Sequence, residues 1–385
     1  MTIAQIVFRF DAPGGVETNV REVTRRLIKR GRPVHVYASD LEREQPWTVR
    51  RERPAEVDGV PVDWFPARAG LFPPFRLPVL LGLIEALDRD RPELLHAHSH
   101  RYLHVVEAAV VAERRGIPLV VTTHYHPALA EMRPARRLLH RIQDVGFGMT
   151  AYRRARAVIV QTELERRLVS GFVPPDRIRL VPPGVDLAAW RSAAEERPPD
   201  GLPETYFLYV GRLAPNKGLP GLLAAYARLD PETRPALVLL GPEWGMGATV
   251  RTLAERLGIG DDLEIVDPIA WPPAYRAVVR GARALVLPSE WESFGLVLLE
   301  AMAAKTPVVA TAVGGVPEAL DGGRCGRLVP YGDTDALAAA LAAVDSEPER
   351  TAAMVDRASA WVEQFDWDRV VDRLLEIYDE AMGRV

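Results

Sequence analysis

Two glutamates, Glu292 and Glu300, are the side chains in this sequence whose spacing first suggests chemistry. Glu292 lies in a polar turn led by Pro288, and Glu300 lies in the apolar stretch 295–304, whose pattern predicts a buried helix. A helix rises ~1.5 Å per residue, which would place the two carboxylates on the order of 10 Å apart. A retaining glycosidase needs two carboxyl groups ~5 Å apart, so this pair does not fit one sugar ring.

The two carboxylates could instead bind the two ends of one extended ligand. The backbone amides of residues 293–295 would then point at an anion beside the ligand, because the first amides of a helix have no partner within it. The alternative is structural, with Glu292 as an acid at a helix N-terminus and Glu300 in a buried ion pair. Spacing alone favours the structural alternative.

A second candidate is the loop Gly211-Arg212-Leu213-Ala214-Pro215-Asn216-Lys217-Gly218, which follows the apolar stretch 206–210. Arg212 offers a planar fork of donors and Lys217 a point charge, a combination suited to a diphosphate. Of the 48 basic residues only Lys29, Lys217 and Lys305 are lysines, so a lysine inside this loop points weakly to a specific role. A surface loop with two ordinary bases is the alternative.

The pair Gly14-Gly15 separates a predicted strand, 3–10, from a predicted helix, 16–30. A glycine turn between a strand and a helix can present backbone amides to a phosphate or sugar oxygen. It lacks the G-x-G-x-x-G spacing of a nicotinamide site, and it could equally be a tight turn without a ligand.

Histidines and paired aspartates could bind metals. His96, His98 and His100 alternate and would share one strand face, with His124 and His126 nearby, but no acidic residue lies within His96–His104. We therefore predict no metal and expect one histidine to hydrogen-bond or polarise a ligand at a strand end. Asp88-Arg89-Asp90, expected on a helix-to-strand loop, and Asp333-Thr334-Asp335, expected to cap a helix, are interpreted as structural.

These residues follow a regular alternation of strands and helices. Apolar runs predict strands near 3–10, 33–38, 60–65, 94–97, 118–122, 157–160, 206–210, 236–240, 263–266, 284–287 and 307–310, and patterned stretches predict helices near 16–30, 79–89, 101–115, 163–170 and 295–304 and over the tail 355–385. Such alternation is typical of α/β domains with parallel sheets, which bind ligands beyond the carboxyl ends of their strands. Length fits two domains, 1–186 and 204–365, with a Pro-rich linker at 187–203 and a last helix at 366–385.

Composition indicates the class of protein and its cellular compartment. The 385 residues are 48% hydrophobic, as in globular proteins, and no apolar run is long enough to span a membrane. The single cysteine, Cys325, forms no intrachain disulfide and fits a cytoplasmic protein, and Met1–Phe8 is interpreted as a strand rather than a signal peptide. Residues 1–200 contain 31 Arg and Lys against 25 Asp and Glu, which permits an anionic acceptor or a lipid surface, and nothing indicates nucleic acid.

Two arginine-rich segments, 131–141 and 152–156, contribute to the excess of basic residues in the first 200 positions. They could dock on anionic lipid, as at the inner membrane face, or on an anionic acceptor. Solvated helix faces are the commoner explanation for such runs, and we favour it.

Taken together and in order, these segments resemble the family-4 retaining glycosyltransferases, which have the GT-B fold. The resemblance covers nearly the whole chain. It rests on Pro13-Gly14-Gly15-Val16-Glu17, Leu95-His96-Ala97-His98, Val121-Thr122-Thr123-His124, Val181-Pro182-Pro183-Gly184-Val185-Asp186, Gly211-Arg212-Leu213 with Lys217-Gly218, the E-x7-E pair Glu292 and Glu300, and Val313-Gly314-Gly315-Val316-Pro317-Glu318.

The resemblance implies two Rossmann-like domains facing a cleft, with the nucleotide mostly on the second and the last helix returning to the first. It implies that Arg212 and Lys217 bind the donor diphosphate, that Glu300 holds the ribose, and that Glu292 contacts the transferred sugar. The catalytic set that it implies is His124, Glu292, Arg212 and Lys217. The donor-binding set is Gly14, Gly15, Arg212, Lys217, Glu292, Ser293, Phe294, Gly295, Leu296 and Glu300.

Three positions depart from the family pattern. Lys305 stands where a glycine is usual, Pro183 replaces an asparagine, and Asp267-Pro268 replaces the turn near the nucleobase. The last change leaves the identity of the base open.

The expected function is transfer of a sugar from a nucleotide diphosphate, with a UDP-sugar favoured, to an acceptor hydroxyl of a small molecule or lipid. No metal or cofactor beyond the donor is expected, and same-face attack is preferred to a covalent Glu292 intermediate. An epimerase or hydrolase on the same fold, a non-catalytic sugar-nucleotide-binding protein and a metal hydrolase using the histidines remain alternatives. Acceptor choice is assigned to the loops 66–78 and 124–150, and the oligomeric state is not predicted.

Overall fold

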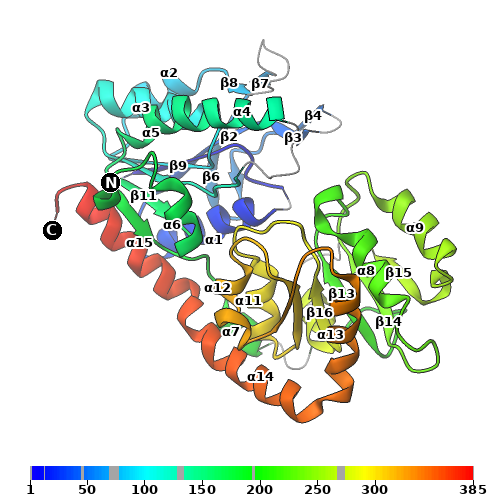
Figure 1. Ribbon diagram of the computed structural model, residues 1–385. Coiled ribbons are helices and arrows are strands. Elements are labelled where there is room, and N and C mark those ends of the chain that lie inside the picture. Colours follow the sequence, from blue (N-terminus) through cyan, green and yellow to red (C-terminus); the bar gives the residue numbers. More distant parts are fainter. Residues whose placement is uncertain are drawn as a thin grey trace. The chain divides into compact units, whose positions relative to one another are not determined.

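The computed structural model describes residues 2–12, 14–44, 47–68, 78–127, 134–192, 196–266 and 274–384. The chain forms two compact units, of which unit 1 comprises Met1–Pro183 and Trp367–Val385 and unit 2 comprises Gly184–Asp366. Each unit is an α/β structure around its own sheet (Figure 1). The predicted α/β class, with two units built on parallel sheets, is confirmed.

Unit 1 is built on an eight-stranded sheet in the order β12-β11-β10-β9-β1-β2-β6-β5. Its neighbouring strands run parallel except β5 and β6. Strands β1, β9, β10 and β11 are buried along their whole length, because helices cover both faces of the sheet. The bounds are β1 Ile3–Val7, β2 Val34–Ser39, β5 Glu56–Val57, β6 Val60–Phe65, β9 Leu94–His98, β10 Leu119–Thr122, β11 Ala157–Val160 and β12 Ile178–Leu180, with two small hairpins, β3 Leu41–Glu44 with β4 Trp47–Val49 and β7 Ala67–Arg68 with β8 Val79–Leu80.

Two layers of helices cover this sheet. Helices α1 (Gly15–Lys29) and α15 (Trp367–Ala381, red in Figure 1) pack on one face through buried side chains such as Leu27 and Val371. Helices α2 (Leu83–Asp90), α3 (Leu103–Arg115) and α5 (Met149–Tyr152) pack on the other face. A π-helical turn, η1 (Asp144–Gly148), joins α4 (Pro134–Gln143) to α5, and α6 (Glu163–Val169) follows β11.

Unit 2 is built on a six-stranded, fully parallel sheet in the order β15-β14-β13-β16-β17-β18. Helices α8, α9 and α13 contribute to the core on one face, and α7, α10, α11, α12 and α14 contribute to the core on the other. The strands are β13 Tyr206–Val210, β14 Ala236–Leu240, β15 Leu263–Val266, β16 Ala284–Leu287, β17 Val308–Thr311 and β18 Arg327–Val329. The helices are α7 Leu187–Ser192, α8 Leu219–Tyr226, α9 Gly247–Arg256, α10 Ala274–Gly281, α11 Leu296–Ala303, α12 Val316–Ala319, α13 Thr334–Ser346 and α14 Pro348–Trp361.

Strand order reverses once in each sheet, and these switch points position the candidate sites. In unit 1, β1 pairs with β2 on one side and with β9 on the other. In unit 2, β13 pairs with β14 and with β16. Loops leaving two such strands diverge to opposite faces and leave a crevice at the carboxyl ends, which is where open α/β sheets bind ligands.

Some local predictions were wrong. The predicted helix 79–89 begins with β8. The predicted helical tail 355–385 is confirmed, as the end of α14, a 3-10 helix at Val362–Phe365 and α15. The triplet Asp88-Arg89-Asp90 lies in the last turn of α2 rather than on a loop. The segment predicted as a linker, 187–203, contains α7, whose Leu187 and Trp190 are buried in the core of unit 2.

Candidate active site

At the switch point of unit 2, the loop after β13 meets the loop after β16. The ammonium Nζ of Lys217 lies 2.6 Å from Oε1 of Glu292, and the hydroxyl of Ser289 donates to the same oxygen at 2.7 Å. Both charged side chains are about 15% exposed, so the pair is shielded but still reachable from solvent. The structure therefore brings together two of the predicted catalytic residues, 75 positions apart in sequence.

Close backbone contact holds these two loops together. The amide of Glu290 donates to the carbonyl of Asn216 at 3.1 Å. Gly218 has a φ of 66°, and a Cβ there would lie 1.9 Å from the carbonyl oxygen of Pro288. Only glycine permits this approach, which explains the Lys217-Gly218 step of the motif.

A second glycine supports Glu292 from the other side. Gly314 has a φ of 53°, and a Cβ there would lie 1.9 Å from the carbonyl oxygen of Glu292. That carbonyl accepts a hydrogen bond from the amide of Gly315 at 2.9 Å. The glycine turn before α12 is thus a backbone support for the loop that carries Glu292.

The start of α11 contains the remaining predicted residues of this loop. Gly295 is the N-cap with a φ of 90°, and it provides no side chain to cap the first amides of the helix, beginning at Leu296. Phe294 is buried and packs against Phe365, so only its backbone can face a ligand. Ser293 is half-buried beside Glu292 in the same turn.

Arg212 lies over the indole of Trp244, with its guanidinium carbon 4.5 Å from the ring centroid. The hydroxyl of Tyr209 donates to the carbonyl of Arg212 at 2.8 Å. Burial raises the pKa of Tyr209, so this donor stays neutral. The sequence interpretation missed Trp244, although its position after β14, at another strand end, was a usable signal.

Glu300 lies in the second turn of α11 and is half-buried. Its carboxylate accepts a hydrogen bond from the hydroxyl of Tyr275, in α10. Burial and the neighbouring carboxylate raise the pKa of Tyr275, so the hydroxyl keeps its proton. No sequence pattern linked these two residues, because they lie on different helices.

In unit 1 the loop after β1 carries Gly14 and Gly15. Helix α1 begins at Gly15, and a Cβ on Gly14 would lie 2.1 Å from a carboxylate oxygen of Glu17. Glu17 is buried and pairs with Arg9 at 2.8 Å. The glycine turn therefore packs against an ion pair at the switch point between β1 and β9.

A chain of polar side chains crosses the core beside this edge. His96 binds the hydroxyl of Tyr378 through Nδ1 at 2.6 Å and Thr122 through Nε2 at 2.7 Å. The Gln5 amide donates to Tyr378 at 3.0 Å, and its oxygen lies 2.7 Å from Nε2 of His98. Burial lowers the pKa of His96 to about 3 and that of His98 well below its usual value, so both rings are neutral.

These partners assign the proton positions. Because Gln5 donates to the Tyr378 hydroxyl, that hydroxyl can give its own proton to Nδ1 of His96, which leaves the Nε2 proton of His96 for Thr122. Nε2 of His98 must likewise donate to the Gln5 oxygen. The histidines of β9 thus pack and hydrogen-bond inside the core.

His124 follows β10 and stacks on His98 at a centroid distance of 5.8 Å. Burial lowers its pKa to about 4, and a hydrogen bond with Gln161 partly opposes this shift. Its Nε2 is buried with no hydrogen-bond partner among the described residues. A neutral imidazole at a strand end suits a hydrogen-bonding role toward a sugar better than a cationic one.

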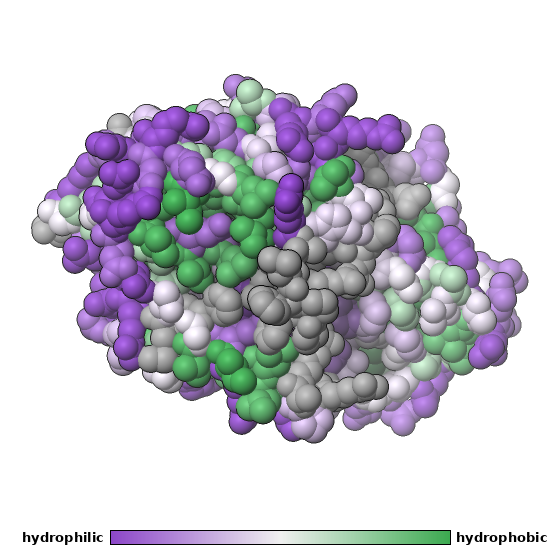
Figure 2. All heavy atoms as spheres, turned by 90° about the horizontal axis from the view of Figure 1, so that it is seen from above, coloured by the Kyte–Doolittle hydropathy of each residue, from purple (hydrophilic) through white to green (hydrophobic). Residues whose placement is uncertain are grey.

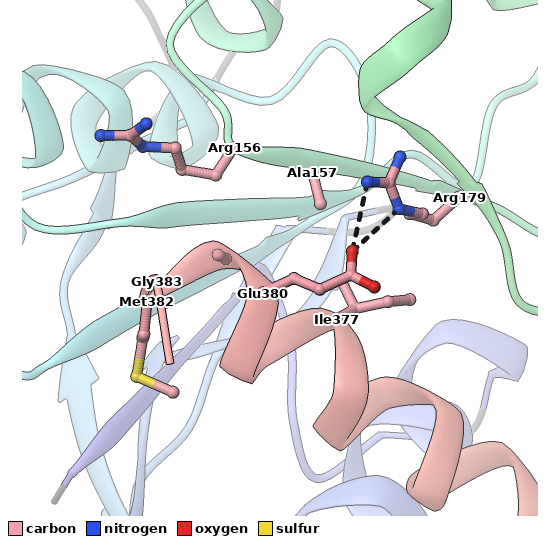
Figure 3. Close-up of a pocket in the computed structure, with 8 residues that line it drawn as sticks. Arg156, Ala157, Arg179, Ile377, Glu380, Met382 and Gly383 are labelled. Atoms are coloured by element: carbon pink, nitrogen blue, oxygen red, sulfur yellow. Dashed lines mark hydrogen bonds and ion pairs between the residues drawn. The ribbon is translucent and has the colours of Figure 1, made fainter. Parts of the chain in front are cut away.

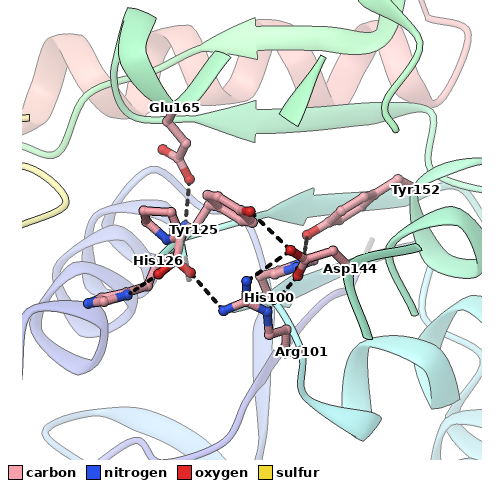
Figure 4. A network of polar contacts seen from close by, with 8 residues as sticks. His100, Arg101, Tyr125, His126, Asp144, Tyr152 and Glu165 are labelled. Atoms are coloured by element: carbon pink, nitrogen blue, oxygen red, sulfur yellow. Dashed lines mark hydrogen bonds and ion pairs between the residues drawn. The ribbon is translucent and has the colours of Figure 1, made fainter. Parts of the chain in front are cut away.

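A second network, centred on Asp144, organises the neighbouring loops (Figure 4). Arg101 donates to both carboxylate oxygens of Asp144 at 2.5 and 3.0 Å, and His100 lies 2.8 Å from the first oxygen. Tyr125 donates to the second oxygen at 3.1 Å, and Arg101 also donates to the carbonyl of His126 at 2.7 Å. Burial alone would raise the pKa of Asp144, but the donors from His100 and Arg101 hold it well below its usual range.

His100 was predicted to share a strand face with His96 and His98, and this was wrong. Strand β9 ends at His98, and Ser99 and Arg101 have φ values of 82° and 63° that turn the chain away. His124 has a φ of 42°. Strained backbone of this kind gathers at functional sites, so the ends of β9 and β10 are the best candidates in unit 1.

Other predicted or possible sites have structural partners. Asp88 pairs with Arg115 at 2.9 Å, Asp90 accepts from Tyr37 at 2.9 Å, and Asp333 caps α13. In the described part of the chain, no group of three or more His, Cys, Asp or Glu side chains is placed to hold a metal.

Unit 1 also has a cavity of about 350 Å³, which lies at the end of α15 and the start of β11 (Figure 3). Arg179 and Glu380 pair across it at 3.2 Å. Because it borders the amino end of β11, it is separate from the predicted site residues at the carboxyl ends.

Some predicted positions lie outside the described residues. These are Pro13, Asp267-Pro268 and the parts of the two predicted acceptor loops at 69–77 and 128–133. None of the helices in the described ranges combines the length and apolar character that a membrane span requires.

Comparison with protein-family models matches both halves of the chain. Residues 13–189 match the model described as Glycosyltransferase Family 4, and residues 193–361 match Glycosyl transferases group 1. The chain is 34% identical to the D-inositol 3-phosphate glycosyltransferase of Saccharomonospora viridis, over 96% of this chain and 90% of that one. It is also 34% identical to the enzyme of the same name from Thermomonospora curvata, over 97% and 92% of the two chains.

Solved structures share the fold. Anabaena HepE, solved in complex with UDP, superposes with a TM-score of 0.76 at 19% identity, over 99% of this chain and 100% of that one. The sucrose-phosphate synthase of Thermosynechococcus elongatus superposes with a TM-score of 0.76 at 23% identity, over 100% of both chains. At these identities the likeness concerns the fold, which is that of GT-B glycosyltransferases.

Proposed function

The chain belongs to the family 4 glycosyltransferases, and on this premise we propose that it moves a sugar from a UDP-sugar to an acceptor hydroxyl, with retention and without a metal ion. The observation that carries the proposal is the pairing of Lys217 with Glu292 at the switch point of unit 2. A cation and a carboxylate at the carboxyl ends of the strands would suit a diphosphate and its attached sugar, which supports the proposal.

The charges explain how such a site would work without a metal. As the anomeric carbon separates from the leaving oxygen, negative charge grows on the β-phosphate. Lys217, Arg212 and the uncapped amides of α11 would stabilise that charge, each contributing ~2–4 kcal/mol by analogy with oxyanion donors. The acceptor oxygen would bond to the anomeric carbon on the same face while its proton passes to the β-phosphate.

The remaining predicted residues receive supporting roles in the proposal. Glu292 would bind sugar hydroxyls, and Glu300, held by Tyr275, would bind the ribose. His124, neutral at physiological pH, would accept or donate one hydrogen bond to the sugar. Gly14 and Gly15 would present backbone amides near the diphosphate.

The comparisons suggest which substrates to test first. HepE was solved with UDP and with UDP-glucose, which supports a uridine donor. The relatives' name supports D-inositol 3-phosphate as the first acceptor. A thermal-shift screen of UDP-, GDP-, ADP- and dTDP-sugars would identify the base, because ligand binding raises the melting temperature through linkage.

Substitution of Lys217 and Arg212, the two cations assigned to the donor diphosphate, tests the mechanism. Lys217→Ala and Arg212→Ala should each lower turnover by roughly 10²–10³-fold, because each removes a donor to the leaving phosphate. Turnover is measured by nucleotide release with saturating donor and acceptor. Addition of a chelator should leave the wild-type rate unchanged.

Matched controls are available on the surface of each unit. Lys29→Ala, at the end of α1, and Arg251→Ala, on α9, should keep the wild-type rate, because both residues are exposed and outside the site. Near-wild-type rates in Lys217→Ala and Arg212→Ala would contradict the proposal that these two side chains bind the leaving diphosphate. Rapid consumption of the nucleotide sugar without acceptor would show an epimerase or hydrolase instead.

A further inference from the structure

Helix α4 and the π-helical turn η1 carry the most exposed large hydrophobic side chains of the described chain. Leu138 and Ile142 are each 60% exposed, and Val145 is 56% exposed. Their spacing of four and three residues places them on one side of a continuous helical segment. We call these three residues the α4 stripe.

The helical segment that carries the stripe is basic. Residues 134–148 contain three arginines, Arg136, Arg137 and Arg141, and a single acidic residue, Asp144. Asp144 is buried and engaged by Arg101 and His100, so it does not offset the charge at the surface. Arg141 is exposed and Arg137 half-buried on the same helix, one turn apart beside the stripe.

The opposite side of this segment is fixed to the core. Gln143 and Asp144 are buried, and Tyr152 of α5 lies 2.6 Å from Nδ1 of His100 through its hydroxyl. The apolar and basic face is therefore held in place by Asp144 before any partner binds. On the side of unit 1 that carries α3 and α4 in Figure 1, Figure 2 shows a hydrophobic area bordered by hydrophilic side chains.

We propose that the α4 stripe and its arginines dock unit 1 on the surface of an anionic lipid bilayer. An apolar stripe flanked by arginines is the composition that binds at the headgroup boundary, where aliphatic side chains insert and guanidinium groups reach phosphates. A second copy of this chain fits less well, because a two-fold interface would bring the same basic surfaces together. The proposal does not depend on the transfer reaction or on its acceptor.

Vesicle sedimentation tests the docking surface with the full-length protein. The protein should sediment with vesicles of phosphatidylglycerol and phosphatidylcholine at about 0.1 M salt, and less so at about 0.5 M salt, where charge is screened. Vesicles of phosphatidylcholine alone should retain much less of it. The triple variant Leu138→Ser, Ile142→Ser, Val145→Ser should bind at least about tenfold more weakly, because its stripe no longer inserts.

The arginines are tested separately. Arg137→Ser and Arg141→Ser should each weaken binding to the anionic vesicles about fivefold, the contribution expected of one basic residue near such a surface. Arg251→Ser and Tyr331→Ser, at exposed positions of unit 2, serve as controls and should bind like the wild type.

Three results would overturn the proposal. The first is failure of the wild type to bind anionic vesicles. The second is equal binding by the triple variant and the wild type. The third is a lower mass of the triple variant in analytical ultracentrifugation, which would identify a second copy as the occupant. If the triple variant melts at a lower temperature than the wild type, its loss of binding could reflect unfolding. Vesicle binding by the two arginine variants then decides whether the docking proposal holds.

Discussion

Lys305 follows the last turn of α11 in a left-handed backbone conformation, with a φ of 60°. Its amide donates to the carbonyl of Met302, and the amide of Thr306 donates to the carbonyl of Ala301. This pair of bonds is the Schellman arrangement that ends many helices, and its left-handed position is usually occupied by glycine. Glycine would adopt this conformation without strain. The lysine side chain is exposed.

Replacing Lys305 with glycine should therefore stabilise the protein. Lys305→Gly should raise the free energy of unfolding by about 1 kcal/mol, because an L-residue pays ~1–2 kcal/mol in this conformation and glycine does not. Urea unfolding measures the change. Lys305→Ala keeps the strain and should match the wild type, and a glycine variant no more stable than the alanine variant would contradict this account.

Residues with local signals were predictable from the sequence, and residues with distant partners were not. Arg212, Lys217, Glu292 and the glycines next to them stand at strand ends, where a pattern can indicate them. The pairing of Arg101 with Asp144 spans 43 positions and has no local pattern, because it depends on how a helical segment packs over a strand end.

At the scale of elements, β9 and α3 carry three histidines that burial keeps neutral. Burial lowers the pKa of His104 to about 4, partly opposed by its bond to a backbone carbonyl, and the pKa values of His96 and His98 are also lowered. In the unfolded chain these rings titrate near 6.5. Between about pH 6.5 and 4 the unfolded state therefore binds more protons than the folded state, and stability falls as the pH is lowered.

We expect the free energy of unfolding to decrease from pH 7 to pH 5 by about 1 kcal/mol per pH unit for each of these histidines, below pH 6.5. Urea unfolding at several pH values measures the slope. Glu107, also on α3, has the opposite effect on the pH dependence of stability. Burial and Glu85 raise its pKa to about 7, so in the folded protein Glu107 holds a proton in this pH range, and its contribution to stability grows as the pH is lowered. Glu107→Gln should make the free energy of unfolding fall more steeply on acidification. A free energy of unfolding that does not change with pH in the wild type would contradict the conclusion that these histidines are neutral in the folded protein.

Strands were easier to predict than the elements between them. A strand of a doubly covered parallel sheet is a short apolar run, so the predicted strands of both sheets are present. The π-helical turn η1, the hairpins and α7 have mixed compositions without a period, and tertiary packing decides their conformation.

At the scale of the molecule, unit 1 is discontinuous and unit 2 is one uninterrupted stretch. Helix α15 supplies Trp367, Val371 and Tyr378 to the core of unit 1, and Tyr378 also binds His96 and Gln5. A fragment of residues 184–366 should therefore fold and unfold cooperatively. A fragment of residues 1–183 should not, because it lacks one of the helices that cover its sheet.

Circular dichroism and thermal unfolding of the two fragments measure this difference. Adding residues 367–385 as a separate peptide should restore cooperative unfolding to the first fragment, since it returns the missing core side chains. Cooperative unfolding of residues 1–183 alone would show that α15 is dispensable for that unit.

The same discontinuity sets the order in which the protein can mature on the ribosome. Domains generally fold as units while synthesis proceeds from the N-terminus. Here the half of the chain made first is completed last, because the Tyr378 hydroxyl that joins Gln5 to His96 is translated after the whole of unit 2. Nascent unit 1 must wait with the surface beneath α15 uncovered, so it should depend on chaperones until α15 is made, and termination before α15 should leave it incomplete.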